Sequence, residues 1–408
     1  MKYSILSKRI LHEFNQIRNL SQSKRLVLGI ESTFDDSAAA VIDEDGKVLG
    51  ESIKSQMLEH KITGGVHPVT AMKLHEVNLP LVVDDVMDKA GIDFQDLSAV
   101  ATATQPGSAL SLQAGLIFSK HLVAKHRLPF IPVHHMEAHA LTVRSIEEVN
   151  FPFLVLLASG GHCLLCLAQH LGNYKILGQI LDEPPGAVFD KVAREIVKDL
   201  PPEYCSTTSG GRIIEALAKK GDSLKHPFSI PLTGHTKTVR SRSCNFSFSG
   251  LQSQVLRKIA IFRERNELDI AACQDVAASF QKAAIQHITN QLHRGIIFCQ
   301  IRNLLQPSPI LVLSGGVAAN SCLRESVLNI CNKMNTKLIC PPIHLCTDNG
   351  IMIAWAGMEY LKQGIGISED SENVRYEPRS PLGDYIGDEI IKENIKLPKV
   401  KVSWKRHI

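Results

Sequence analysis

Two histidines four residues apart are the first feature of the sequence that could do chemistry. His135 and His139 belong to residues 134–139, HHMEAH. In a helix, residues at i and i+4 lie on one face, so both imidazoles could bind one metal ion. Glu137 would face away, and the glutamate that directly follows the first histidine in zinc proteases is missing. Ordinary surface or core histidines are the alternative to a metal site.

A carboxylate far along the chain could complete this site. Asp348 lies in residues 344–350, HLCTDNG, just before a segment with helical apolar spacing. The chain contains an internal repeat, described below. If residues 344–350 are the second-half counterpart of residues 134–139, Asp348 would face His135 and His139 across a cleft. Two histidines and one carboxylate suit a catalytic metal with open positions. The alternative is that Asp348 caps the following helix or compensates its dipole.

Two Ser-Gly-Gly turns could bind phosphate. Residues 159–161 and 314–316 each follow a strand-like apolar segment, and the second turn precedes a helix that contains Asn320. Glycines let backbone N–H groups approach phosphate oxygens, and a helix N-terminus adds a favourable dipole. A single turn of this kind is weak evidence, because tight turns need glycine anyway. Two in corresponding places, with Gly315 and Gly316 in the second, predict a nucleotide or phosphate site.

Further carboxylates lie in turns or near helix starts. Glu31, Asp35 and Asp36 lie in the first predicted hairpin turn. They either stabilise the turn or position a metal-bound water or an attacking amine. Asp190 precedes a helical segment, where capping is favoured over binding of ribose hydroxyls.

An internal repeat indicates how the chain positions these residues. Residues 27–50 predict a meander of three strands, and the same order recurs at residues 154–178. Each half continues with a strand, a helix, another strand and a further helix. The repeat predicts an α/β fold of two lobes with a central cleft, where the functional site is expected.

This pattern divides the chain into parts. We expect a leader at residues 1–25, a first lobe at 26–150 completed by a helix at about 348–363, a second lobe at 151–345 with an insertion at about 201–250, and a loosely packed extension at 366–408.

Composition and charge exclude several classes of protein. The 408 residues are 44% hydrophobic and 21% charged, which suits two or three folded domains and excludes disorder. The formal net charge of +4 is concentrated in the basic, amphipathic leader, which is typical of a mitochondrial transit peptide; a frayed N-terminal helix is the alternative. The longest apolar segment, 151–168, is interrupted by a glycine turn, so no membrane span is predicted.

Cysteines and basic segments give weaker signals. The 10 cysteines follow no disulfide framework, which fits a reducing compartment, and Cys163 and Cys166 are expected to be buried thiols in a strand. Basic residues at 235–242 near Phe246 and Phe248, and in the tail at 396–406, are candidate RNA contacts, with solvated surface charge as the alternative.

Several motifs together resemble the tRNA N6-adenosine threonylcarbamoyltransferases. They are residues 29–32 (GIES), 35–36 (DD), 64–66 (GGV), 134–139 (HHMEAH), 159–162 (SGGH), 189–191 (FDK), 246–250 (FSFSG) and 346–350 (CTDNG). The resemblance runs from about residue 26 to 382. It is closest to the animal mitochondrial branch, which agrees with the leader.

The resemblance implies a fold, a reaction and a location. The fold is the duplicated actin-like ATPase fold of sugar kinases and heat-shock ATPases. The reaction is transfer of the threonylcarbamoyl group from threonylcarbamoyl-AMP to N6 of the adenosine 3′ of the anticodon, in tRNAs that read codons beginning with A. The implied location is the mitochondrial matrix. The implied partners are mitochondrial tRNA, an upstream synthase that makes the unstable adenylate, and a second copy of the chain in a homodimer.

The resemblance also implies site residues. It places one divalent metal ion per subunit, with Fe, Zn and Mg all open, on His135, His139 and Asp348. The implied adenylate contacts are Leu157, Ala158, Ser159, Gly160, Gly161, Asp190, Gly211 and Asn320.

Other classes of protein would use only part of this set. An ATP-dependent kinase or chaperone of the same fold would use the glycine turns without the histidines. A metalloprotease would use the histidines but lacks the adjacent glutamate. A non-catalytic RNA-binding module would need neither.

Overall fold

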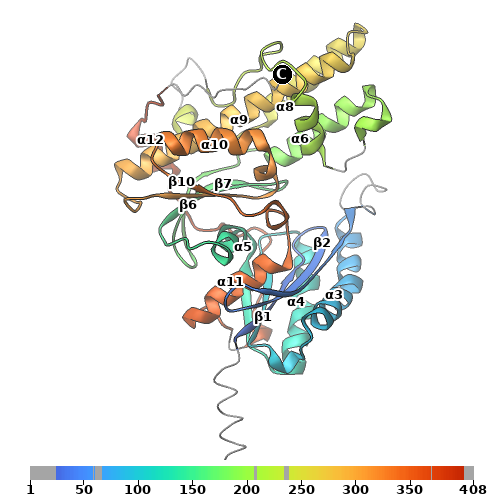
Figure 1. Ribbon diagram of the computed structural model, residues 1–408, viewed down its shortest axis with the longest axis vertical. Coiled ribbons are helices and arrows are strands. Elements are labelled where there is room, and N and C mark those ends of the chain that lie inside the picture. Colours follow the sequence, from blue (N-terminus) through green and yellow to red (C-terminus); the bar gives the residue numbers. More distant parts are fainter. Residues whose placement is uncertain are drawn as a thin grey trace, which may run out of the picture. The chain divides into compact units, whose positions relative to one another are not determined.

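The computed structural model describes residues 24–57, 59, 67–205, 209–233, 239–368 and 370–398, which form two compact units (Figure 1). Unit 1 ends at His135 and includes Asn349–Arg379, while unit 2 contains Met136–Asp348 and the chain from Ser380 onwards. The predicted leader, except for its last two residues, and the motif at 64–66 lie outside the described residues.

Unit 1 is built on a mixed sheet of five strands in the order β3-β2-β1-β4-β5. The strands are β1 Leu26–Glu31, β2 Asp36–Asp43, β3 Val48–Ser55, β4 Ala99–Gln105 and β5 Phe130–His134. The first three form an antiparallel meander, and β4 then pairs in parallel with β1 and β5 in parallel with β4. Side chains of β1 and β4 are buried along almost their whole length, as expected for strands covered on both faces.

Helices cover both faces of this sheet. Helices α3 (Pro68–Ala90) and α4 (Ala109–His126) pack against one face, and α11 (Gly350–Gln363) packs against the other (Figure 1). The contact of α11 with the sheet is very close. A Cβ at Gly29 would lie 2.2 Å from the Ala354 nitrogen, and a Cβ at Gly350 would lie 2.2 Å from the Ala39 carbonyl carbon. Glycine at both positions is therefore required for helix and strands to approach this closely.

Unit 2 repeats the same strand order. Its sheet has the order β10-β9-β6-β7-β8-β11. The strands are β6 Phe153–Ala158, β7 Cys163–His170, β8 Asn173–Gln179, β9 Ile310–Ser314, β10 Lys337–Ile339 and β11 Asp384–Tyr385. Again a meander comes first, and two parallel strands follow on its first strand. The predicted duplicated α/β fold of the actin-like type is confirmed by this repeat, and the central cleft stays a prediction.

The core of unit 2 is organised around one long helix. Its helices are α5 His135–Leu141 at the unit boundary, α6 Pro185–Ile196, α7 Gly210–Ala218, α8 Ser249–Glu264, α9 Ile270–Ile301, α10 Ser321–Lys333 and α12 Gly387–Glu393. An apolar stripe of α9, which includes Val276, Phe280 and Leu292, is buried in this core. Cys163 and Cys166 are also buried, so the prediction of buried thiols is confirmed, and burial raises the pKa of both.

Two expectations about the surface differ from the structure. Phe246 and Phe248 are fully buried, and both rings pack edge-on against His287, so they are not available to stack on RNA bases. Residues expected in a loose tail instead form β11, which extends the sheet, and α12, which buries Ile390 in the core. Among the described residues, no helix is both long enough and apolar enough to span a membrane.

Candidate active site

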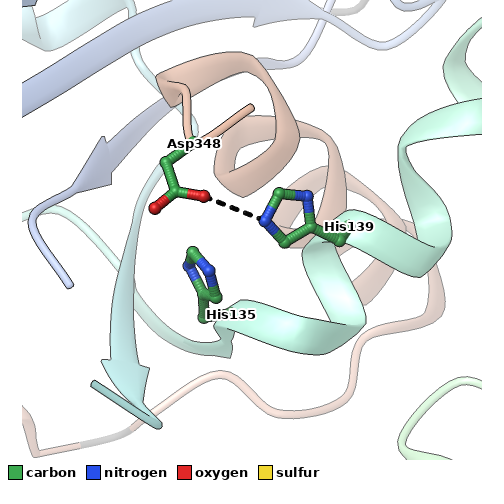
Figure 2. A group of neighbouring side chains, drawn as sticks. All are labelled: His135, His139 and Asp348. Carbon is green, nitrogen blue, oxygen red and sulfur yellow. Dashed lines mark hydrogen bonds and ion pairs between the residues drawn. The ribbon is translucent and has the colours of Figure 1, made fainter. Parts of the chain in front are cut away.

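Helix α5 carries both predicted metal-binding histidines. His135 is its first residue and His139 lies one turn later, and both side chains are buried. Ligand atoms of His135, His139 and Asp348 all lie within 4.8 Å of one another (Figure 2). His139 Nε2 is 3.1 Å from Asp348 Oδ1. Two ligand atoms of one ion lie roughly 3 Å apart when each bond is about 2.1 Å long. We call these three residues the metal triad.

Asp348 is not the cap of the following helix. The cap of α11 is Asn349, whose side chain accepts a hydrogen bond from the Met352 N–H at 2.9 Å. The capping alternative for Asp348 is therefore wrong. Its carboxylate instead faces His139, and its side chain is 27% exposed, so a ligand could approach the oxygen.

Glu31 orients the first histidine of the triad. Its Oε2 lies 2.9 Å from His135 Nδ1, and both side chains are buried. Its other oxygen accepts the Thr33 N–H at 2.6 Å. A carboxylate beside Nδ1 favours the tautomer with the proton on Nδ1, which places the ligating lone pair of the ring on Nε2. The two histidines, the carboxylate and this supporting carboxylate are a donor set that fits a divalent transition metal.

The hairpin turn after Glu31 is held by a histidine that the sequence analysis missed. His75, on the buried face of α3, lies with Nδ1 2.7 Å from Ser37 Oγ and donates from Nε2 to the Phe34 carbonyl at 2.9 Å. The available signal was a histidine among the apolar positions of an amphipathic helix. Asp35 lies in this turn and Asp36 begins β2, and the metal triad includes neither of them.

The two Ser-Gly-Gly turns lie next to each other in unit 2. Strands β6 and β9 are parallel neighbours with Leu157 opposite Ser314, so both turns leave the same edge of the sheet, where ligands bind in α/β folds. Gly315 has a φ of 98°, and a Cβ there would lie 2.4 Å from the Ala158 carbonyl oxygen. By contrast, Gly160 and Gly316 have open space where a Cβ would be. This space lets a ligand approach the backbone closely.

Asp190 lies in the middle of α6 rather than at its start. The capping interpretation is wrong, because the helix already begins at Pro185. The carboxylate instead accepts the Gly210 N–H at 2.9 Å, which ties α6 to the start of α7. Burial raises the pKa of Asp190, while hydrogen bonds from the Gly210 and Gly211 amides oppose the rise. Gly211, another predicted adenylate contact, therefore lies next to this carboxylate.

Asn320 and the start of α6 complete the surroundings of the turns. Asn320 caps α10 by accepting the Leu323 N–H at 3.0 Å, and its amide donates to Gln281 Oε1 at 2.9 Å. A Cβ at Gly186 would lie 2.7 Å from the Gly160 Cα, so α6 packs directly on the first turn. Ser314 Oγ is buried and has no hydrogen-bond partner among the described residues.

Comparisons with known proteins show which family the chain belongs to. The family model described as tRNA N6-adenosine threonylcarbamoyltransferase matches residues 47–355. The chain belongs to this family. The mitochondrial tRNA N6-adenosine threonylcarbamoyltransferase of Rattus norvegicus is 47% identical over 385 residues, which cover 93% of this chain and 91% of that protein. The Homo sapiens protein of the same name is 46% identical over 97% of this chain and 96% of its own length. Among solved structures, T. kodakarensis HypF is 14% identical over 84% of this chain and 48% of that chain, with a TM-score of 0.49.

The contact between Glu31 and His135 predicts that a substitution of Glu31 weakens metal binding by this threonylcarbamoyltransferase. We expect Glu31→Gln to weaken metal affinity by about 10- to 100-fold, because the neutral amide no longer favours the proton on Nδ1. The measurement is a competition titration of metal-free protein with a chromophoric chelator. Glu44→Gln, at an ion pair with Arg25 beside the same sheet, is the matched control and should bind metal like the wild type. Equal affinities for both variants would contradict the orienting role.

We expect the Asp190 carboxylate to lower the stability of the fold and to strengthen the binding of the ligand. Its pKa is raised in the folded state, so at pH 7 ionisation works against folding, and the stability of the wild type relative to Asp190→Asn should fall as pH rises from about 4 through the raised pKa. Asp190→Asn is therefore expected to unfold at a slightly higher temperature at pH 7. The same variant should bind AMP roughly tenfold more weakly, because it loses a charged acceptor. Calorimetric unfolding and AMP titration test the two effects, and a variant that binds AMP normally would remove Asp190 from the adenylate site.

Proposed function

We propose that this chain transfers a threonylcarbamoyl group from threonylcarbamoyl-AMP to N6 of the adenosine 3′ of the anticodon, in mitochondrial tRNAs that read codons beginning with A. The enzyme is a mitochondrial tRNA-modifying transferase, like its named relatives. The observation that carries the proposal is the metal triad, in a family whose name states this transfer. The kinase, chaperone and protease alternatives are not favoured, and Met136 occupies the position of the protease glutamate.

The reaction requires an activated donor and precise orientation. The exocyclic amine of adenine is a weak nucleophile, because its lone pair is delocalised into the ring. Holding both reactants in line can lower the barrier by roughly 7 kcal/mol or more. In the proposal, the open backbone at Gly160 and Gly316 binds the adenylate phosphate, and residues 157–161, Asp190, Gly211 and Asn320 hold the nucleoside.

The metal triad and the hairpin carboxylates have separate roles in the proposal. When bound to the triad, a divalent ion, whose identity among Fe, Zn and Mg stays open, would stabilise negative charge on donor oxygens. Glu31 keeps His135 in the ligating tautomer. Asp35 or Asp36 accepts the proton that the N6 amine loses.

Two partners complete the proposal. An upstream synthase that makes the unstable adenylate from threonine, bicarbonate and ATP supplies the donor. A second copy of the chain forms a homodimer, which light scattering of the purified protein tests as a doubled mass.

The decisive experiment supplies both substrates directly. Metal-loaded protein is mixed with threonylcarbamoyl-AMP and an unmodified mitochondrial tRNA transcript, and the nucleosides are analysed by mass spectrometry. We expect N6-threonylcarbamoyladenosine to form, and none to form on a transcript with guanosine at the target position. A metal-loaded protein that forms no modified nucleoside, yet hydrolyses ATP without tRNA, would replace the proposal with an ATPase.

A further inference from the structure

Arg324 connects the second glycine turn of unit 2 to the loop that leads to Asp348. It lies in the first turns of α10, and its Nε donates to the Ala318 carbonyl at 2.6 Å. Ala318 belongs to the short helix Gly316–Ala319, which begins within the glycine turn. Nη2 of the same guanidinium donates to the Pro341 carbonyl at 3.3 Å and lies 3.7 Å from Cys346 Sγ. One side chain therefore contacts both the short helix after the glycine turn and the loop that leads to Asp348.

Cys346, the last of these contacts of Arg324, lies two residues before Asp348 of the metal triad. Cys346 is buried, and its Sγ also donates to the Pro341 carbonyl at 3.6 Å. Burial raises the pKa of this thiol, while the Arg324 charge and hydrogen bond and the Gly315 amide oppose the rise. Glycine turn, guanidinium and thiol are thus in mutual contact. Asp348 follows Cys346 after a single intervening residue, so the contacts of Cys346 constrain the backbone close to the Asp348 carboxylate.

The partners of Arg324 are unusual for arginine. Among the described residues no carboxylate forms an ion pair with it, although a guanidinium normally favours bidentate binding to a carboxylate or a phosphate. Its donors instead reach two backbone carbonyls and a sulfur. Among the residues that the structure describes, this positive charge beside the turn therefore has no paired carboxylate.

We propose that Arg324 is a positioning residue that couples adenylate binding at the turn of Gly315 and Gly316 to the position of Asp348, so that adenylate and metal bind cooperatively. The inference rests on the proposed function, because it takes an adenylate to be the ligand of this turn. A bound phosphate orders the turn and the short helix after it, and Arg324 passes this order to the Asp348 loop. By linkage, the metal must tighten adenylate binding by the same factor.

The test measures metal affinity with and without nucleotide. Zn²⁺ is titrated into metal-free protein against a chromophoric chelator, in buffer alone and with saturating AMP. In the wild type we expect AMP to increase Zn²⁺ affinity at least about fivefold, and Zn²⁺ to increase AMP affinity equally. In Arg324→Met the factor should fall to about one, while Zn²⁺ affinity without AMP changes little. Arg324→Lys, which keeps the charge and loses the fork of donors, should retain part of the coupling.

Controls separate coupling from stability and from the proposed function. Arg257→Met, on the exposed face of α8, should keep the full factor. If Arg324→Met does not fold by calorimetry, the lysine variant carries the test. A coupling factor unchanged in the folded variants, or a factor of one in the wild type, would overturn the proposal. If instead AMP tightens Zn²⁺ binding but no modified nucleoside forms, the coupling stands and the proposed function fails.

Discussion

Asp348→Ala should lower the rate of threonylcarbamoyl transfer by about a hundredfold or more. The variant removes the carboxylate that lies 3.1 Å from His139, so a metal bound as we propose would lose one of three protein ligands. Metal stabilisation of transition-state charge is worth several kcal/mol, and each 1.36 kcal/mol changes a rate tenfold. The measurements are initial rates of nucleoside formation by mass spectrometry and the metal content of the purified protein.

Controls for this variant follow from the way α11 begins. Because Asn349 caps the helix, Asp348→Ala should keep the unfolding temperature of the wild type, which distinguishes a metal defect from a folding defect. Asp348→Asn retains a neutral ligand oxygen, so its transfer rate should lie between the rates of the wild type and of Asp348→Ala. Glu325→Ala, an exposed carboxylate on α10, should be fully active. An alanine variant that keeps its metal and its rate would show that Asp348 is not a ligand.

Gly315→Ala is expected to be the most destabilising glycine substitution at the candidate site. Its φ of 98° is unfavourable for any residue with a Cβ, and that atom would lie 2.4 Å from the Ala158 carbonyl oxygen. The strained backbone alone costs about 1–3 kcal/mol, before the clash that separates the parallel pair β6 and β9. Each kcal/mol lowers the unfolding temperature of a domain of this size by about 2–4 °C.

The neighbouring glycine provides the matched comparison. Gly316→Ala adds its Cβ to open space, so this variant should unfold near the wild-type temperature. It should still bind AMP roughly tenfold more weakly, because the methyl group occupies the space through which a phosphate would approach the backbone. Calorimetry and AMP titration of both variants test the pair. Normal AMP affinity in Gly316→Ala would mean that the turn has only a structural role.

Local patterns were sufficient for much of the fold and for the two histidines of the triad. The repeated meander follows from alternating apolar runs and turn residues, which depend on short-range geometry. The same is true of His135 and His139, since the i and i+4 spacing places them on one face once a helix forms. Asp348 required a further step, because only the correspondence of the two halves indicated it.

The wrong expectations have two physical causes. A shift of a few residues in a helix boundary decides which side chain is the cap, and this affected Asp348 and Asp190. The proline at residue 185, a common first residue of helices, was the signal that α6 begins before Asp190. Long-range contacts are the second cause. His75 and Arg324 contact other segments of the chain, and no local pattern indicates which groups they reach.

The close approach of α11 to its sheet limits how this protein can vary. Backbone atoms of the helix and of β1 and β2 are in direct contact at Gly29 and Gly350, so neither position can accept even a methyl group. A saturation mutagenesis library should therefore lose every substitution at these two glycines, including in cells that need no modified tRNA but report only protein abundance. Such a helix cannot slide or rotate by small steps on its sheet. Asp348 directly precedes the capping residue of this helix, so the helix fixes the backbone next to Asp348.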